Sequence, residues 1–187
     1  MEEEVSFILD HAKEQMQKAI LHLDAELLKI RAGKASPQML EGVYVDYYGS
    51  NVPLSNVANV NTSDARTLVI QPWEKAMLHP IEKAIAAANL GLNPQNDGTL
   101  IRINVPLLTE ERRKDLVKQS KAEAENAKVS IRSIRREANE AVKKSQKEGL
   151  PEDMAKDAEA KIQQATDSSI VKVEERLEIK EKEIMTV

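Results

Sequence analysis

Three stretches of this chain, residues 1–30, 107–148 and 152–185, contain neither glycine nor proline. Without these helix breakers, each stretch is free to form one uninterrupted helix. In the first stretch the apolar residues recur every three or four positions, as one face of an α-helix requires. The residues on this face are Val5, Ile8, Ala12, Met16, Ala19, Ile20, Leu23, Leu27 and Ile30. The sequence therefore predicts long amphipathic helices that bury their apolar faces against one another.

The ends of the predicted helices carry residues that start or stop a helix. Gly33 and Pro37 follow the first helix, where a glycine can form a left-handed cap and a proline opposes continuation. Thr109 is a good N-cap for the second helix, and Gly149–Leu150–Pro151 separates it from the third. Because such a short turn places two helices side by side in opposite directions, we expect an antiparallel three-helix bundle.

Between the bundle segments 1–30 and 106–187, residues 31–105 follow a different pattern. Apolar and polar residues alternate with a period near two, and turn-forming residues separate the short runs, as in strands joined by turns. We expect strands near residues 43–47, 57–61, 67–71 and 100–105, turns at Gly49–Ser50–Asn51 and Asn96–Asp97–Gly98, and a helix from about Glu74 to Asn89. The predicted fold class is therefore α+β: a three-helix bundle with an inserted β/α/β domain.

The second long helix carries a row of positive side chains. At about 100° per residue, its apolar side contains Ile131 and Ile134. We refer to the cations about a quarter-turn from that side as the basic stripe, with Arg135 between the two groups and Glu125 as its acidic member. The stripe consists of Lys114, Lys118, Lys121, Lys128, Arg132, Arg136 and Lys143. Evenly spaced cations can follow a phosphate backbone, and arginine adds a planar fork for phosphate. The alternative is a solvated charged face, the usual explanation for charged helix positions.

Charge is unevenly distributed along the chain. The net formal charge is −4 in residues 1–30, 0 in 31–104, +4 in 105–148 and −4 in 149–187. A mildly acidic protein has thus concentrated its positive charge on one segment, which a purely solubilising surface does not require. This concentration favours an anionic partner for the second helix, and RNA is the natural polyanion to suspect.

Signals of catalysis are missing from the sequence. His11, His22 and His79 do not follow a metal-binding spacing, and no glycine-rich phosphate loop occurs. We therefore expect a protein that is not an enzyme and has no metal or other cofactor. The sequence contains no cysteine, no run of 18 apolar residues and an acidic start unlike a signal peptide. We expect a cytosolic protein with no membrane partner.

The aromatic residues leave two interpretations open. Tyr44, Tyr47 and Tyr48 could stack on RNA bases, but the glycine and phenylalanine pattern of RNA-binding sheets is absent, which favours ordinary strand positions. Trp73 precedes the predicted short helix, where it either packs at the helix start or lies on a contact surface. The sequence does not choose between these alternatives.

Six sequence blocks resemble the ribosome recycling factor family, and together they cover essentially the whole chain in the family's order. The blocks are Ile30 to Pro37, Tyr47-Tyr48-Gly49, Ala65-Arg66-Thr67-Leu68, Leu90 to Pro94, Pro106 to Lys114, and Ile131 to Asn139. The departures are small: Lys34 where arginine is frequent, Ser133 where asparagine is common, and Glu137 where aspartate often stands. None of these departures removes a basic contact.

This resemblance implies an L-shaped protein, similar in outline to transfer RNA, with a hinge between the two domains. It implies that the bundle binds 23S ribosomal RNA of the large ribosomal subunit after termination. It also implies that elongation factor G, which binds the GTP, works with the other domain to separate the subunits and free the mRNA. The candidate rRNA-binding residues are Arg132, Arg135, Arg136, Lys128, Arg31 and Lys34.

Two chain crossings, at residues 31–36 and 104–106, join the predicted domains. A paired linker containing glycine and proline can act as a hinge, and a fixed elbow is the alternative. The predicted hinge residues are Gly33, Ser36, Pro37, Val105 and Pro106.

Two other functions fit parts of the pattern. A scaffold that binds other proteins would explain the long helices, but it does not need a basic stripe. An RNA chaperone would explain the stripe, but it should bind naked RNA about as well as ribosomes. We expect a monomer, because a three-helix bundle can bury its apolar faces within one chain.

Overall fold

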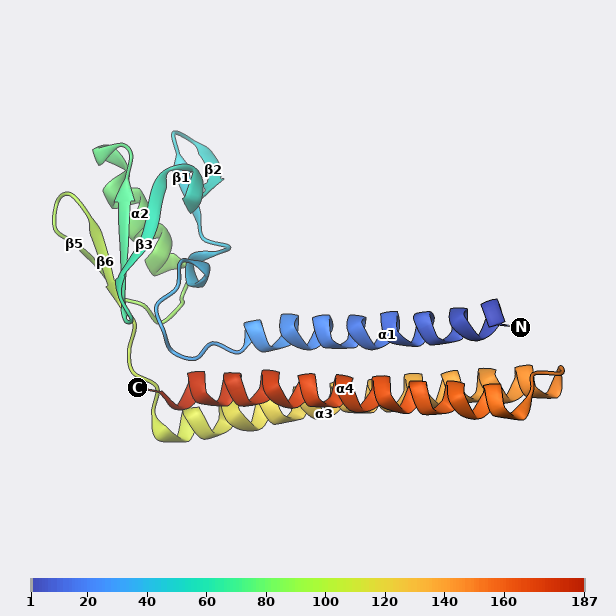
Figure 1. Ribbon diagram of the computed structural model, residues 1–187. Coiled ribbons are helices and arrows are strands. Elements are labelled where there is room, and N and C mark those ends of the chain that lie inside the picture. The colour runs from blue at the N-terminus through green and yellow to red at the C-terminus, as the bar shows by residue number, and fades with distance from the viewer. Residues whose placement is uncertain (1, 187) are drawn as a thin grey trace. The chain divides into compact units, whose positions relative to one another are not determined.

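The computed structural model describes residues 2–186, so the outer domain ends predicted at residues 1 and 187 lie outside it. The chain divides into two compact units (Figure 1). One unit extends to Ala32 and resumes at Thr109, and the other is Gly33–Leu108. We refer to them as the bundle unit and the small unit.

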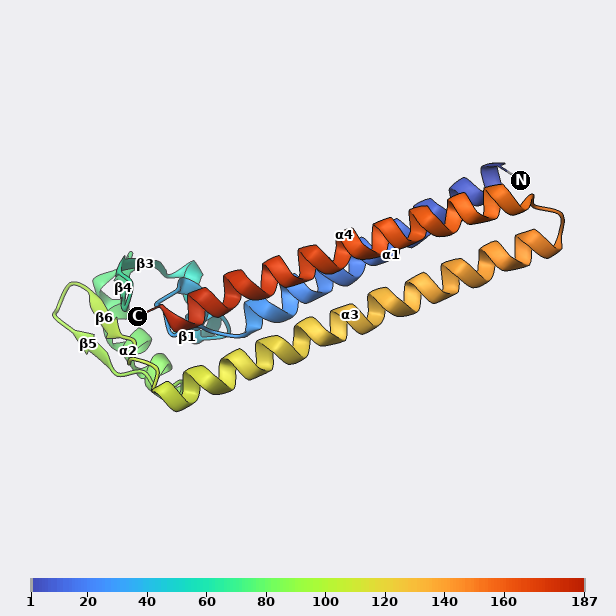
Figure 2. The ribbon, with the colours of Figure 1, turned by 60° about the horizontal axis from the view of Figure 1, so that its bottom comes forward.

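The bundle unit consists of three long helices: α1 (Glu2–Lys29), α3 (Glu110–Lys147) and α4 (Glu152–Met185). Each helix packs against the other two, and Figures 1 and 2 both show them side by side. α1 and α4 run in the same direction, and Arg176 Nε donates to Asp24 Oδ1 across them at 3.1 Å. The predicted three-helix bundle is confirmed.

Local interactions fix both ends of α3. The Thr109 hydroxyl accepts a 3.1 Å hydrogen bond from the Arg112 N–H, which confirms the predicted N-cap. At the other end, Gly149 has a φ of 115° and the Leu150 N–H donates to the Ser145 carbonyl at 2.9 Å. Leu150 is buried, so its side chain anchors the turn that leads into α4.

Apolar side chains from all three helices fill the bundle core, which also contains small polar residues. Val117 and Ala141, expected on the apolar face of α3, are only half-buried, and Leu116 and Val142 are buried instead. These neighbours have larger apolar side chains than the alanine, or longer ones than the valine, and gain more from burial. Buried Ser120 donates to the Leu116 carbonyl at 2.9 Å, which satisfies its hydroxyl inside the core.

The small unit contains a four-stranded antiparallel sheet, a separate hairpin and one helix. The sheet has the order β3-β4-β6-β5. Its strands are β3 (Ala58–Asp64), β4 (Thr67–Pro72), β5 (Pro94–Asn96) and β6 (Ile101–Asn104), the hairpin is β1 (Tyr44–Tyr47) and β2 (Ser50–Pro53), the helix is α2 (Leu78–Ala87), and short 3-10 turns lie at Pro37–Leu40, Leu54–Asn56 and Lys75–Met77. Leu68, Ile70, Ile101 and Ile103 of the sheet share one buried core with Ile81 and Ile85 of α2. This arrangement agrees with the predicted α+β class.

Two predicted elements of the small unit have different bounds. The expected helix from Glu74 to Asn89 is shorter, because a 3-10 turn precedes α2 and Pro80 lies in the first turn of α2. A proline has no N–H to donate, so it fits the first turn of a helix and not its interior. The strand β5 was not predicted, since it has three residues and begins with Pro94 at a sheet edge.

The hairpin turn lies one position earlier than predicted. Tyr47 pairs with Ser50, so the turn consists of Tyr48 and Gly49, whereas Ser50 and Asn51 belong to β2. Both turn residues have positive φ, 48° and 87°. Such a two-residue turn matches the twist of the strands that it joins.

Candidate nucleic-acid interface

Four of the candidate RNA-binding residues, Lys128, Arg132, Arg135 and Arg136, lie on α3. At 1.5 Å per residue, they span about 12 Å of the helix axis. Ile131 on the same helix is fully buried in the bundle, which holds this segment of α3 in place. The helix therefore presents these cations from a rigid support.

Several members of the basic stripe are already paired with carboxylates. Lys128 Nζ lies 3.3 Å from Glu174 Oε1 of α4, and the lysine side chain is only 19% exposed. Lys121 Nζ lies 3.9 Å from Glu181 Oε1, also on α4. Arg132 Nη1 donates to Glu125 Oε1 at 3.2 Å within α3. Glu174 and Glu181 were not anticipated, because only the packing of α4 beside α3 brings them to the stripe.

Other cations of α3 remain available. Among residues 2–186, no carboxylate lies within ion-pair distance of Arg135, Arg136 or Lys143. Arg136 is exposed and Arg135 is half-buried. The stripe is therefore uneven: its middle is partly neutralised by α4, and its unpaired arginines follow toward the end of α3. Arginine forks without an internal partner are the side chains best suited to phosphate.

The remaining two RNA-binding candidates lie outside α3. Arg31 follows α1 in the bundle unit, and Lys34 belongs to the small unit. Both side chains are exposed.

Three predicted hinge residues are built into the small unit. The Ser36 hydroxyl accepts a 3.3 Å hydrogen bond from the Gln38 N–H and caps the first 3-10 turn, in which Pro37 is the first residue. Val105 is buried in the core of the small unit. Local hydrogen bonding and burial hold these three residues, whereas Pro106 is exposed.

The turn between β3 and β4 binds both linkers where they enter the small unit. The Ala35 N–H donates to the Ala65 carbonyl at 2.8 Å, and the Val105 N–H donates to the Arg66 carbonyl at 2.7 Å. The turn is itself fixed, because Asp64 Oδ1 accepts from the Arg66 N–H at 2.8 Å. This backbone hydrogen bond is the main reason why the pKa of the Asp64 carboxyl is lowered. One turn therefore clamps two segments that are about 70 residues apart in sequence.

Gly33 fills a position that other residues do not fit. Its φ is 75°, and an added Cβ would lie 2.6 Å from Leu108 Cγ. Leu108 ends the second linker, so the two linkers meet at this glycine. A side chain here would meet both an unfavourable backbone conformation and a steric clash.

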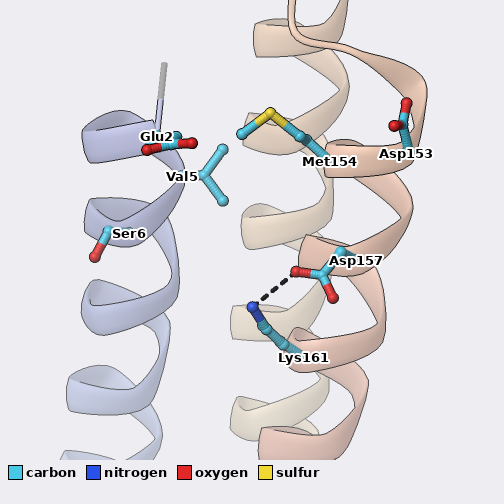
Figure 3. Close-up of a pocket in the computed structure, with 7 residues that line it drawn as sticks. All are labelled: Glu2, Val5, Ser6, Asp153, Met154, Asp157 and Lys161. Atoms are coloured by element: carbon cyan, nitrogen blue, oxygen red, sulfur yellow. Dashed lines mark ion pairs between the residues drawn. The ribbon is translucent and has the colours of Figure 1, made fainter.

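The other end of the bundle has the opposite charge. A groove of about 430 Å³ lies between the first turns of α1 and α4, lined by acidic residues including Glu2, Asp153 and Asp157. Figure 3 shows Lys161 directed toward Asp157, with which it forms a 2.7 Å ion pair, and Val5 and Met154 on the facing helices. Phosphate would be repelled by the excess carboxylates, so the candidate RNA-binding face is confined to α3.

Residues 2–186 contain no cluster of three or more histidine, aspartate or glutamate side chains that could hold a metal ion. Within the same residues, no helix has the length and apolar character needed to cross a membrane.

The chain is similar to ribosome recycling factors along its entire length. The family model described as ribosome recycling factor matches residues 23–185. The ribosome-recycling factor of Flavobacterium psychrophilum is 57% identical over 187 residues, which is all of both chains. That of Bacteroides fragilis is 54% identical over 184 residues, or 98% of this chain and 99% of the relative.

Two solved structures are also similar. One is the solution structure of a ribosome recycling factor, with 38% identity, 98% of each chain covered and a TM-score of 0.72. The other is described as models for the T. thermophilus ribosome recycling factor and the E. coli elongation factor G bound to the E. coli post-termination complex. Its matching chain is 45% identical, with 97% of this chain and 99% of that chain covered and a TM-score of 0.60.

Proposed function

Because this chain belongs to the ribosome recycling factor family, we propose that it separates the subunits of post-termination ribosomes together with elongation factor G and GTP. It is a translation factor and not an enzyme. Its partners are the ribosome, mainly 23S rRNA of the large subunit, and elongation factor G, which binds the GTP. The protein acts in the cytosol as a monomer, and the separated subunits leave the mRNA.

The observation that carries the RNA-binding part of this proposal is the set of cations on α3. Arg135 and Arg136 have no carboxylate partner within residues 2–186, and Lys128 and Arg132 adjoin them on the same helix. Guanidinium groups on a rigid helix can form charge-assisted hydrogen bonds with phosphates at fixed spacing. Arg31 and Lys34 add exposed cations near the linkers.

The bundle acts as a rigid lever on the large subunit. Three long helices packed along their lengths resist bending, so a force applied to one end is transmitted to the other. The small unit receives that force from elongation factor G, and GTP hydrolysis by the partner supplies the energy. Contacts between the ribosomal subunits break as a result.

A hinge between the units lets the small unit follow its moving partner while the bundle stays on the RNA. Ala35 and Val105 are hydrogen-bonded to the β3–β4 turn, which supports a pivot outside these two residues. The pivot then consists of residues 30–34 and 106–108, with Gly33 and Pro106 as its members from the predicted set. Ser36, Pro37 and Val105 move with the small unit.

The deciding experiment is light scattering of post-termination ribosomes mixed with the protein, elongation factor G and GTP. Subunit separation lowers the scattered intensity, and the fall should require all three additions. An Arg132→Ala or Arg135→Ala variant should abolish most of the fall at protein concentrations that suffice for the wild type. No fall with a matched elongation factor G would contradict the proposed function.

Binding assays separate the two rival functions. A protein-binding scaffold should neither pellet with ribosomes nor bind RNA, and an RNA chaperone should bind naked rRNA as well as it binds ribosomes. We expect ribosome binding that is stronger than naked-RNA binding and that weakens steeply with salt.

A further inference from the structure

Two tyrosines of the β1–β2 hairpin hold one carboxylate at the surface of the small unit. The Tyr47 hydroxyl donates a 2.9 Å hydrogen bond to Glu74 Oε1, and the Tyr48 hydroxyl donates one of equal length to Oε2. The two phenol rings meet edge to face, with centres 4.7 Å apart. Trp73, which is 62% exposed, directly precedes the glutamate. We refer to Tyr47, Tyr48, Trp73 and Glu74 as the aromatic carboxylate patch.

The conformation of Tyr48 is not one that the fold alone would favour. Its φ of 48° lies in the left-handed region, and turns of this kind normally use asparagine, aspartate or glycine at this position. Tyr48 is 76% exposed, so burial of its ring does little to offset this conformation. Strained residues of this kind gather at functional sites. We therefore look for the role of this ring at the surface.

The hydrogen bonds of Glu74 orient its carboxylate. Hydrogen bonds between exposed groups add little to stability, because water competes for both partners. The hydrogen bonds to Glu74 raise the pKa of both phenols, so each tyrosine stays a protonated donor at neutral pH. An ionised carboxylate has about four acceptor positions, and the two phenols leave others open to solvent. The result is a fixed negative charge flanked by exposed aromatic rings.

This combination favours one type of ligand. A carboxylate attracts a cation, and an aromatic face adds a cation–π contribution, most strongly for tryptophan. The same carboxylate repels phosphate, which argues against the base-stacking role considered for these tyrosines. We propose that the aromatic carboxylate patch receives an arginine or lysine side chain of the protein partner that acts on the small unit. The existence of that partner rests on the proposed function, whereas the binding chemistry rests on the patch alone.

Trp73 provides a direct test, since it is the only tryptophan of the chain. Its fluorescence should change saturably when the full-length protein is titrated with a hexa-arginine peptide. Hexaglutamate and oligouridylate should give no saturable change. Glu74→Gln should weaken the arginine response about tenfold, because the amide keeps the size of the side chain and removes its charge.

Glu41→Gln is the matched control, because it removes one exposed carboxylate elsewhere in the same unit and should leave the titration unchanged. Tyr48→Phe tests the hydroxyl separately and should weaken the response less than Glu74→Gln. The proposal is overturned if hexa-arginine gives no saturable change, if Glu74→Gln responds like the wild type, or if oligouridylate binds more tightly than the peptide. The last result would assign the patch to RNA.

The splitting reaction provides the second test. Glu74→Gln and Trp73→Ala should slow subunit separation by about tenfold with elongation factor G and GTP, while ribosome pelleting stays within about twofold of wild type. Rates equal to wild type for both variants would overturn the assignment to this partner. If the wild type itself does not separate subunits, the proposed function fails, and the fluorescence titration alone decides the patch.

Discussion

The bundle unit and the small unit present different surface chemistry. α3 displays cations in a row along a rigid helix, whereas the small unit displays exposed aromatic residues beside an oriented carboxylate. Phosphate contacts are long-ranged and sensitive to salt, and aromatic contacts are short-ranged and far less so. The difference indicates that one chain can hold an RNA with one unit and a protein with the other, without the two ligands competing.

The largest expected effect tests whether the two units are independent in stability. Ile131→Ala should destabilise the bundle by about 2–5 kcal/mol, because it leaves a cavity at a fully buried position. Far-UV circular dichroism, dominated by the long helices, should show a lower unfolding temperature, while Trp73 fluorescence should report an unchanged transition in the small unit. Val129→Ala, at a 55% exposed position of the same helix, is the control. A joint shift of both transitions would show that the units unfold as one.

The next effect concerns ribosome binding. The double variant Arg135→Ala and Arg136→Ala should lower ribosome affinity about 10- to 100-fold, because it removes two charge-assisted contacts. Its dependence on log salt concentration should be shallower by about two phosphate contacts. Pelleting at a series of salt concentrations measures both quantities. Lys156→Ala, which removes an exposed lysine from α4, should change neither, and an unchanged salt slope in the double variant would exclude the α3 face.

A smaller effect of the opposite sign should follow from Glu174→Gln. Lys128 would lose its internal partner and become free for phosphate. Since exposed ion pairs contribute about 0.2–1 kcal/mol, ribosome affinity should rise no more than about fivefold. Glu178→Gln is the control, because Glu178 pairs with Lys182 of its own helix. Weaker binding by Glu174→Gln would indicate that this pair positions Lys128 for RNA.

The smallest effect is a pH dependence confined to the small unit. Asp97 Oδ1 accepts backbone hydrogen bonds from Leu100 and Thr99, which lower the pKa of its carboxyl below the unfolded value of about 3.9. Its stabilising contribution is therefore complete above that value and is lost as the pH falls through the folded pKa. Thermal unfolding followed by Trp73 fluorescence should show that wild type exceeds Asp97→Asn at pH 6 and that the gap closes near pH 3. A constant gap would mean that the charge of Asp97 is not involved.

The sequence predicted the bundle well, because the periodicity of each long helix is a local property. It did not reveal the carboxylates that neutralise part of the stripe. The pairing of Lys128 with Glu174 depends on how two helices align across 46 positions of sequence, and helical periodicity contains no such alignment.

The small unit was less predictable for the same reason. Tyr47 and Glu74 are 27 positions apart and meet only after the hairpin folds onto the start of α2. The resemblance to a known family supplied the candidate function, and no pattern of single residues indicated the aromatic carboxylate patch.

The carboxylates of α4 beside the stripe also affect how long the protein remains on its ligand. When phosphates leave Lys121 and Lys128, Glu181 and Glu174 are already in place to take over these lysines. Dissociation then becomes an exchange of partners, in which the lysines need not wait for counterions from solution. A factor that serves one ribosome after another requires a short residence time, and these two glutamates provide a built-in means of release.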